Sequence, residues 1–187
     1  QGLVKGGRSS KQQPLLQIGN HVEVKWRARL DEHLGQYTME PITFSAAKLM
    51  ESQMALNGMQ VLASHLRLLP DRDPHPALFD RYRDSLPALA SGHEMLAQAA
   101  LRAFEIALLR ETGVLPELER VTLTQQALEP QAHYQLLPES GVVATREEQG
   151  SLLGAQLHAL HDALGEDSAA ALQQACATCL PALRPAL

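Results

Sequence analysis

Apolar and polar residues alternate along residues 21–29. The even-numbered positions are apolar: Val22, Val24, Trp26 and Ala28. The odd-numbered positions are charged: Glu23, Lys25, Arg27 and Arg29. Successive side chains of a strand point to opposite faces, so this pattern predicts a half-buried strand of an antiparallel sheet. Residues 34–40, ended by Pro41, predict the next strand after a polar turn at residues 31–33.

After Pro41 the apolar residues adopt helical spacing. The predicted helices run from Ser52, a plausible N-cap, to Pro70; from Leu78 to Leu89; from Glu94 to Thr112 before Gly113; from Leu153 to Leu164; and from Ser168 to Cys179, ended by Pro181. Residues 134–145 predict a small hairpin. The pattern therefore predicts an α+β fold, with a small antiparallel β domain at residues 1–42 and a mostly α-helical domain at residues 43–187.

Composition indicates a folded globular protein. Of the 187 residues, 45% are hydrophobic and 20% are charged. No apolar run approaches the ~18 residues of a membrane helix, and no basic segment followed by an apolar one opens the chain. We therefore expect a cytoplasmic protein. Aromatic residues make up only 4%, which leaves little material for stacking bases.

The net charge of −5 would argue against a nucleic-acid partner, but the charges are unevenly distributed. Residues 1–30 contain one acid, Glu23, and six bases: Lys5, Arg8, Lys11, Lys25, Arg27 and Arg29. The first 30 residues therefore carry +5 and the remainder carries −10. Such an asymmetry favours an anion-binding surface near the start of the chain.

The basic strand gives this surface a geometry. Lys25, Arg27 and Arg29 would project from one face at intervals of ~6.6 Å, twice the rise per residue. That spacing approaches the distance between phosphates of an extended single strand. Lys5, Arg8 and Lys11, on a Gly/Ser-rich loop, would add cations beside it. A solvated strand face with scattered counterions is the alternative.

No catalytic motif is present. Gly6 to Lys11 resembles a phosphate loop in composition only, because Gln-Gln-Pro follows where a helix should begin. His158 and His161 could share one helix face as metal ligands, but no further ligand at a telling spacing completes a site. Cys176 and Cys179 lie in an apolar helix, where we expect buried structural thiols. We expect no catalytic residue, metal or other cofactor.

Arg102 and Arg110 lie beside Phe104, Leu108 and Leu109 in the third predicted helix. An arginine at the lip of an apolar groove suits a peptide that ends in hydrophobic residues and a carboxylate. An arginine that covers the edge of the core with its aliphatic stem is the alternative.

These segments, in this order, resemble the RecO family of bacterial DNA repair proteins. The resemblance rests on Leu3–Arg8, Val22–Arg29, Leu34–Pro41, Phe104–Gly113, Leu115–Glu119 and Tyr134–Gly141. It spans essentially the whole chain.

The resemblance implies an N-terminal OB-fold, a helical domain and no enzymatic turnover. It implies binding and annealing of single- and double-stranded DNA, and loading of the recombinase RecA together with RecR and the single-stranded-DNA-binding protein SSB. Lys5, Arg8 and Lys11 match the family's basic loop. Arg102 matches an arginine of the groove for the acidic, Phe-ending SSB tail, with Phe104 and Leu108 at its wall.

Two features depart from the family pattern. The four-cysteine zinc module of some members is absent after Gly113, because no cysteine precedes Cys176. An OB barrel has five strands and about three are predicted here, counting a strand end that runs into the basic loop within residues 1–13, so we expect further strands before Gln1. Two other functional classes remain open. One is a helical protein-interaction adaptor without direct DNA binding, and the other is a metal-dependent hydrolase using His158 and His161.

Overall fold

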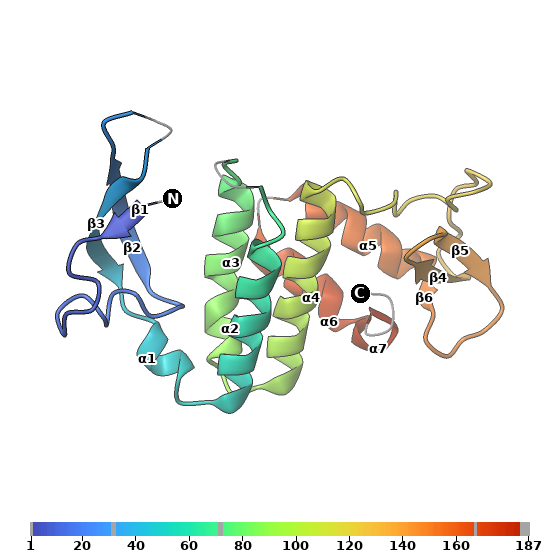
Figure 1. Cartoon of the computed structure of the whole chain (residues 1–187). Helices are drawn as coiled ribbons and strands as arrows, with labels where there is room; N and C mark the ends of the chain where they lie inside the picture. The colour runs from blue at the N-terminus through green and yellow to red at the C-terminus, as the bar shows by residue number, and fades with distance from the viewer. Residues whose placement is uncertain (1, 31–32, 71–72, 167, 184–187) are drawn as a thin grey trace.

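The computed structural model describes residues 2–30, 33–70, 73–166 and 168–183. The strands are β1 (Gly2–Val4), β2 (His21–Arg27), β3 (Gly35–Thr43), β4 (His133–Leu137), β5 (Gly141–Thr145) and β6 (Leu152–Leu153). The helices are α1 (Ala46–Leu49), α2 (Gln53–Leu66), α3 (Pro76–Leu89), α4 (Glu94–Glu111), α5 (Gly154–Gly165), α6 (Ala169–Ala177) and α7 (Leu180–Leu183). Figure 1 shows a sheet at each end of the molecule and the helices between them. The fold is α+β, as predicted.

The first sheet has the strand order β1-β3-β2. β2 and β3 are antiparallel, as predicted, but β1 pairs with β3 in parallel, with Gly2 opposite Gly35 and Val4 opposite Tyr37. The expectation of a purely antiparallel sheet was therefore wrong. Alternation within one strand does not specify the direction of its neighbours, which depends on how the loop of residues 5–20 returns the chain.

Pro41 does not end the second predicted strand, because β3 continues to Thr43. The register shifts at this point: Val22 lies opposite Pro41, whereas His21 lies opposite Thr43. β1 pairs only with residues 35–37 of β3, so the missing N–H of Pro41 removes no hydrogen bond to β1. A proline is tolerated at such an irregular position of a sheet.

β2 is not half-buried as predicted. Val24 and Trp26, on its apolar face, remain 44% and 37% exposed. The strand also ends at Arg27, so Arg29 lies beyond it rather than in line with Lys25. Ring contact with the helices occurs at the start of β2, where the centroids of His21 and Phe79 lie 5.6 Å apart.

The main helices follow the predicted periodicity. Ser52 and Ser168 cap α2 and α6 by accepting hydrogen bonds from the N–H groups of Ala55 and Ala171. Gly113 follows α4 with φ of +71°, a conformation that favours glycine. The sequence pattern missed the short helices α1 and α7. α7 contains Pro181, which was expected to end the chain's last helix but is compatible with a first helical turn.

α4 is the central helix and packs against α2, α3, α6 and α7. Its buried residues cover most of its circumference and include Phe104, Ile106 and Leu108. The ring of Phe104 packs edge-on against the ring of Tyr82 of α3, and the two ring centroids lie 6.3 Å apart. A helix enclosed on several sides loses the narrow apolar stripe of a surface helix. Among the described residues, no helix is long and apolar enough to cross a bilayer.

The predicted hairpin is confirmed by the pairing of β4 with β5. β6 adds a third strand on the other side of β4. Leu153, expected within a helix, ends β6 and precedes α5. The boundary between the two predicted domains, near residue 42, remains a prediction.

Candidate functional site

Three cations converge at one end of the first sheet. Lys5, Arg27 and Arg29 line an open hollow of about 630 Å³. β1 and β2 flank the beginning of β3, with Val4 opposite Tyr37 and Arg27 opposite Gln36. The residue after β1 and the last residue of β2 are thereby brought together across β3. We name Lys5, Arg27 and Arg29 the cationic cluster.

Lys25 does not behave as a free cation. Its Nζ lies 3.5 Å from Oε1 of Glu23 and 4.0 Å from Oε1 of Glu40. Glu40 comes from β3, outside the basic first 30 residues, so the charge sum of that segment did not include it. Among the described residues, the three members of the cationic cluster make no such ion pair.

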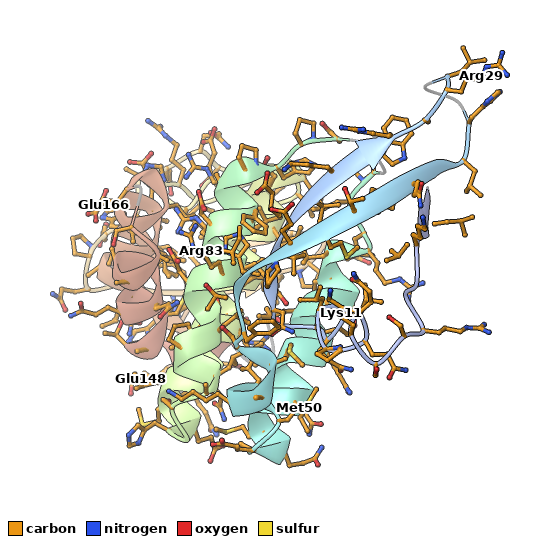
Figure 2. The ribbon with its side chains drawn as sticks, turned by 90° about the vertical axis from the view of Figure 1, so that its left-hand side faces the viewer. Lys11, Arg29, Met50, Arg83, Glu148 and Glu166 are labelled. Carbon is orange, nitrogen blue, oxygen red and sulfur yellow. The ribbon has the colours of Figure 1, made fainter. Side chains whose placement is uncertain are left out.

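The other two predicted loop cations, Arg8 and Lys11, do not line this hollow. Arg8 and Lys11 are exposed in the turns between β1 and β2. Figure 2 shows Lys11 well separated from Arg29, which extends from the tip beyond β2. The structure therefore does not gather the six predicted DNA-binding residues into one continuous surface.

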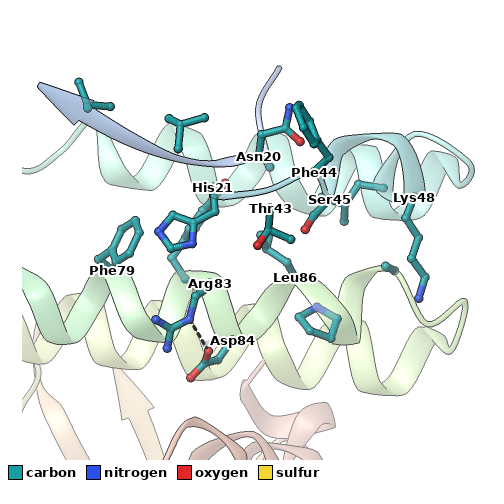
Figure 3. Close-up of a pocket in the computed structure, with 17 residues that line it drawn as sticks. Asn20, His21, Thr43, Phe44, Ser45, Lys48, Phe79, Arg83, Asp84 and Leu86 are labelled. Atoms are coloured by element: carbon teal, nitrogen blue, oxygen red, sulfur yellow. Dashed lines mark hydrogen bonds and ion pairs between the residues drawn. The ribbon is translucent and has the colours of Figure 1, made fainter. Parts of the chain in front are cut away.

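A second cavity, of about 630 Å³, lies between the first sheet and α3. Val22, Phe44 and Phe79 contribute to its mainly apolar lining (Figure 3). Arg83 also lines it, but its guanidinium is paired with Asp80 at 2.7 Å and Asp84 at 2.9 Å. Sequence reasoning did not find this cavity, because it joins segments that are distant in the chain.

Phe104 and Leu108 do not form the wall of an open groove, contrary to expectation. They are 1% and 5% exposed, inside the core. Arg102, on the same helix, has a side chain 21% exposed and pairs with Glu105 at 2.7 Å. Arg110 donates a hydrogen bond to the carbonyl oxygen of Leu164, near the end of α5. It therefore stabilises a helix C-terminus rather than lining the Arg102 surface.

An open groove does lie near Arg102, between α2 and α4. It has a volume of about 450 Å³, and its lining includes Met54, Gly58, Val61, Gln98 and Leu101. We name it the α2–α4 groove. Gly58 forms part of its floor, where a Cβ would lie only 2.8 Å from a methyl group of Leu89.

The lining itself includes the polar residues Asn57 and Glu94. Arg102 and His65 lie one helical turn beyond Gln98 and Val61, just past the lining, and we call this position the polar end of the α2–α4 groove. Nδ1 of His65 lies 4.0 Å from Oε1 of Glu105. The α2 half of this site was missed because amphipathic spacing does not specify which two helices pack together.

Burial is the main cause of the pKa shifts of Glu105 and His65 at this polar end. It raises the pKa of Glu105, and the positive charge of Arg102 partly opposes that shift. Burial also lowers the pKa of His65, and Arg102 lowers it further. His65 is therefore neutral at pH 7. When Glu105 is ionised, its negative charge balances the positive charge of Arg102.

The two cysteines are free and buried, as predicted. Burial raises the pKa of Cys176, and it raises the pKa of Cys179 to about 11. Because the thiolate is the reactive form, we expect both thiols to react slowly at neutral pH.

The two candidate metal ligands do not gain a third partner. His161 is exposed, with Nε2 3.4 Å from a carboxylate oxygen of Glu119. Within the part of the chain that the structure describes, no three His, Cys, Asp or Glu residues are placed to share a metal ion. The hydrolase alternative therefore has no ligand set among these residues.

Comparison with known proteins relates the chain to one family. Residues 62–181 match the family model for the recombination protein O C terminal region. The chain is similar to two proteins named DNA repair protein RecO. It is 47% identical over 127 residues to the one from Brucella abortus (strain 2308) and 45% identical over 148 residues to the one from Chelativorans sp. (strain BNC1). These alignments cover 66% and 78% of this chain, and 49% and 57% of the relatives. The chain thus spans about half the length of the curated relatives it matches. Because the family model matches residues 62–181, from within α2 to within α7, the chain belongs to the RecO family.

Proposed function

We propose that this chain acts in DNA repair as a recombination mediator without enzymatic turnover. It binds single- and double-stranded DNA, anneals complementary strands, and works with RecR and SSB to load RecA at the bacterial nucleoid in the cytoplasm. The observation that carries the DNA-binding part is the convergence of Lys5, Arg27 and Arg29 around one open hollow. The family relationship supports the remainder.

The mechanism is electrostatic. Two phosphodiester strands repel each other, and a cluster of cations lowers that repulsion where both strands are held. Contacts with phosphates are independent of sequence, which suits annealing of any complementary pair. The acidic remainder of the chain keeps the bound strands near the first sheet. We propose that β1, β2 and β3 are three of the five strands of an OB-fold.

Filter binding of single-stranded DNA at several salt concentrations tests this proposal. If the three cluster cations contact phosphates, the logarithm of the association constant falls with the logarithm of salt at a slope of about −2 to −3. The double substitution Arg27→Ala and Arg29→Ala should reduce the steepness of that slope by about 1.5. An unchanged slope would exclude the cluster as the DNA contact.

A second surface, the α2–α4 groove with Arg102 at its end, suits the SSB tail. Apolar side chains of the tail would occupy the space near Met54 and Val61, and its carboxylate would approach the guanidinium of Arg102. Arg102→Ala should weaken the binding of an acidic Phe-ending peptide about tenfold and leave the binding of naked DNA unchanged. Arg146→Ala, which removes an exposed arginine elsewhere, is the matched control.

A protein-interaction adaptor without DNA binding is the alternative function. The neutralisation of Lys25 by Glu23 and Glu40 favours it, because it reduces the cationic surface of the strand. This alternative predicts full peptide binding and no salt-dependent DNA retention on filters.

A further inference from the structure

The residue proposed to receive a ligand carboxylate already contacts a carboxylate of its own chain. Nη1 of Arg102 lies 2.7 Å from Oε2 of Glu105, three residues further along α4. The two side chains are 21% and 11% exposed, so salt and water screen the pair only weakly. Any acidic ligand at the polar end of the α2–α4 groove must share Arg102 with Glu105 or displace it.

The internal pair is close but poorly satisfied. Within the described residues, Oε2 of Glu105 is buried and makes no directed hydrogen bond, and the same holds for Nδ1 of His65. A carboxylate that accepts two parallel N–H bonds from a guanidinium is held more strongly than one that merely lies nearby. A ligand carboxylate that approaches the fork of Arg102 with that geometry therefore has an advantage over Glu105.

The local charge balance acts in the opposite direction, against a bound acidic ligand. The groups that face Glu105 are His65 from α2, Arg102 on α4 and the thiol of Cys176 from α6. His65 and Cys176 are neutral at pH 7, because burial disfavours the charged form of each. With Glu105 ionised, an acidic peptide meets no net positive charge at this end of the groove.

We propose that Glu105 is an internal competitor for Arg102 that sets the affinity of the α2–α4 groove for acidic peptides. The proposal rests on the peptide-binding function proposed above. It also gives the groove selectivity, because a free carboxylate gains too little to displace Glu105. A carboxylate attached to apolar side chains gains the additional burial beside Met54 and Val61.

The test is fluorescence anisotropy of the 187-residue chain with a labelled peptide of aspartates that ends in Phe with a free carboxylate. Glu105→Gln removes the competing charge and should tighten binding about three- to tenfold. Glu105→Met is also neutral and of similar length, and it should tighten binding as well. It replaces the glutamine variant if that variant fails to fold. Glu139→Gln removes an exposed carboxylate from the β4–β5 turn and should leave the affinity unchanged.

The outcomes separate this inference from the function on which it rests. Arg102→Ala combined with Glu105→Gln should bind no better than Arg102→Ala alone, because the gain requires the freed guanidinium. Equal or weaker binding by both folded Glu105 variants, with Arg102→Ala still impaired, would overturn the inference and make Glu105 a positioning residue for Arg102. Absence of peptide binding by the wild-type chain and every variant would overturn the peptide groove itself.

Discussion

Nζ of Lys25 lies 4.0 Å from Oε1 of Glu40, across the pair of strands β2 and β3. Glu40 stands directly opposite Glu23, so Lys25 sits beside two carboxylates on the same face. This arrangement divides the predicted row of cations. Lys25 is neutralised by its neighbours, whereas Arg27, at the end of the strand, joins Lys5 and Arg29 in the cationic cluster.

DNA binding should therefore depend on Arg27 and hardly on Lys25, although both are exposed cations of one strand. Arg27→Ala should weaken single-stranded DNA binding about three- to tenfold at moderate salt, because one phosphate contact is lost. Lys25→Ala should change it less than twofold, since its charge is already offset. Filter binding of both variants beside the wild type makes the comparison. Equal losses would show that the whole strand face contacts DNA.

Gly35 should be essential for the position of Trp26, the only tryptophan of the chain. A Cβ at Gly35 would overlap the indole ring of Trp26. Gly35→Ala should displace the indole, shift its fluorescence emission to the red, and destabilise the protein by about 1–3 kcal/mol. Gly165→Ala, where the added Cβ meets nothing within 4 Å, is the control. An unchanged emission spectrum for Gly35→Ala would contradict the observed packing.

Cys176 and Cys179 should resist thiol reagents in the native protein. Both are buried, and their raised pKa values keep the reactive thiolate scarce at pH 8. Dithionitrobenzoate should titrate two thiols rapidly in concentrated guanidinium chloride and react only slowly without it. Rapid labelling of the native chain would show that α6 opens readily or that the thiols are accessible.

His65 should make the protein less stable as the pH falls below 7. Its pKa is lowered in the native state by burial and by Arg102, so the unfolded chain takes up a proton first. The stability that neutral His65 contributes is complete above its unfolded pKa near 6.5, and it is lost as the pH falls through the lower native pKa.

The raised pKa of Glu105 acts in the opposite sense, because its protonation stabilises the native state as the pH falls toward 4.5. His65→Gln removes only the first effect. Thermal unfolding from pH 7.5 to 5.5 should therefore show a smaller decline for this variant than for the wild type. An identical decline would mean that His65 does not contribute to the acid sensitivity.

Sequence reasoning succeeded where structure is local. The spacing of leucines, the caps at Ser52 and Ser168, and the turn at Gly113 depend on residues within a few positions of one another. It failed for Pro41, because tolerance of a proline depends on whether a neighbouring strand requires its N–H. It also failed for the burial of β2, since alternation reveals two faces but not what covers them.

The sequence by itself determined the order and type of the main elements, the uneven charge, the buried cysteines and the family resemblance, because these features are encoded in short segments and their order. Only the tertiary structure decided which cations lie together. Strand pairing brings Lys5 to Arg27 and brings Glu40 to Lys25. Helix packing likewise decided that Phe104 and Leu108 belong to the core. It also placed α2 along one side of the groove near Arg102. Charged and apolar side chains form a site only when long-range packing brings them together, because packing sets what each side chain contacts.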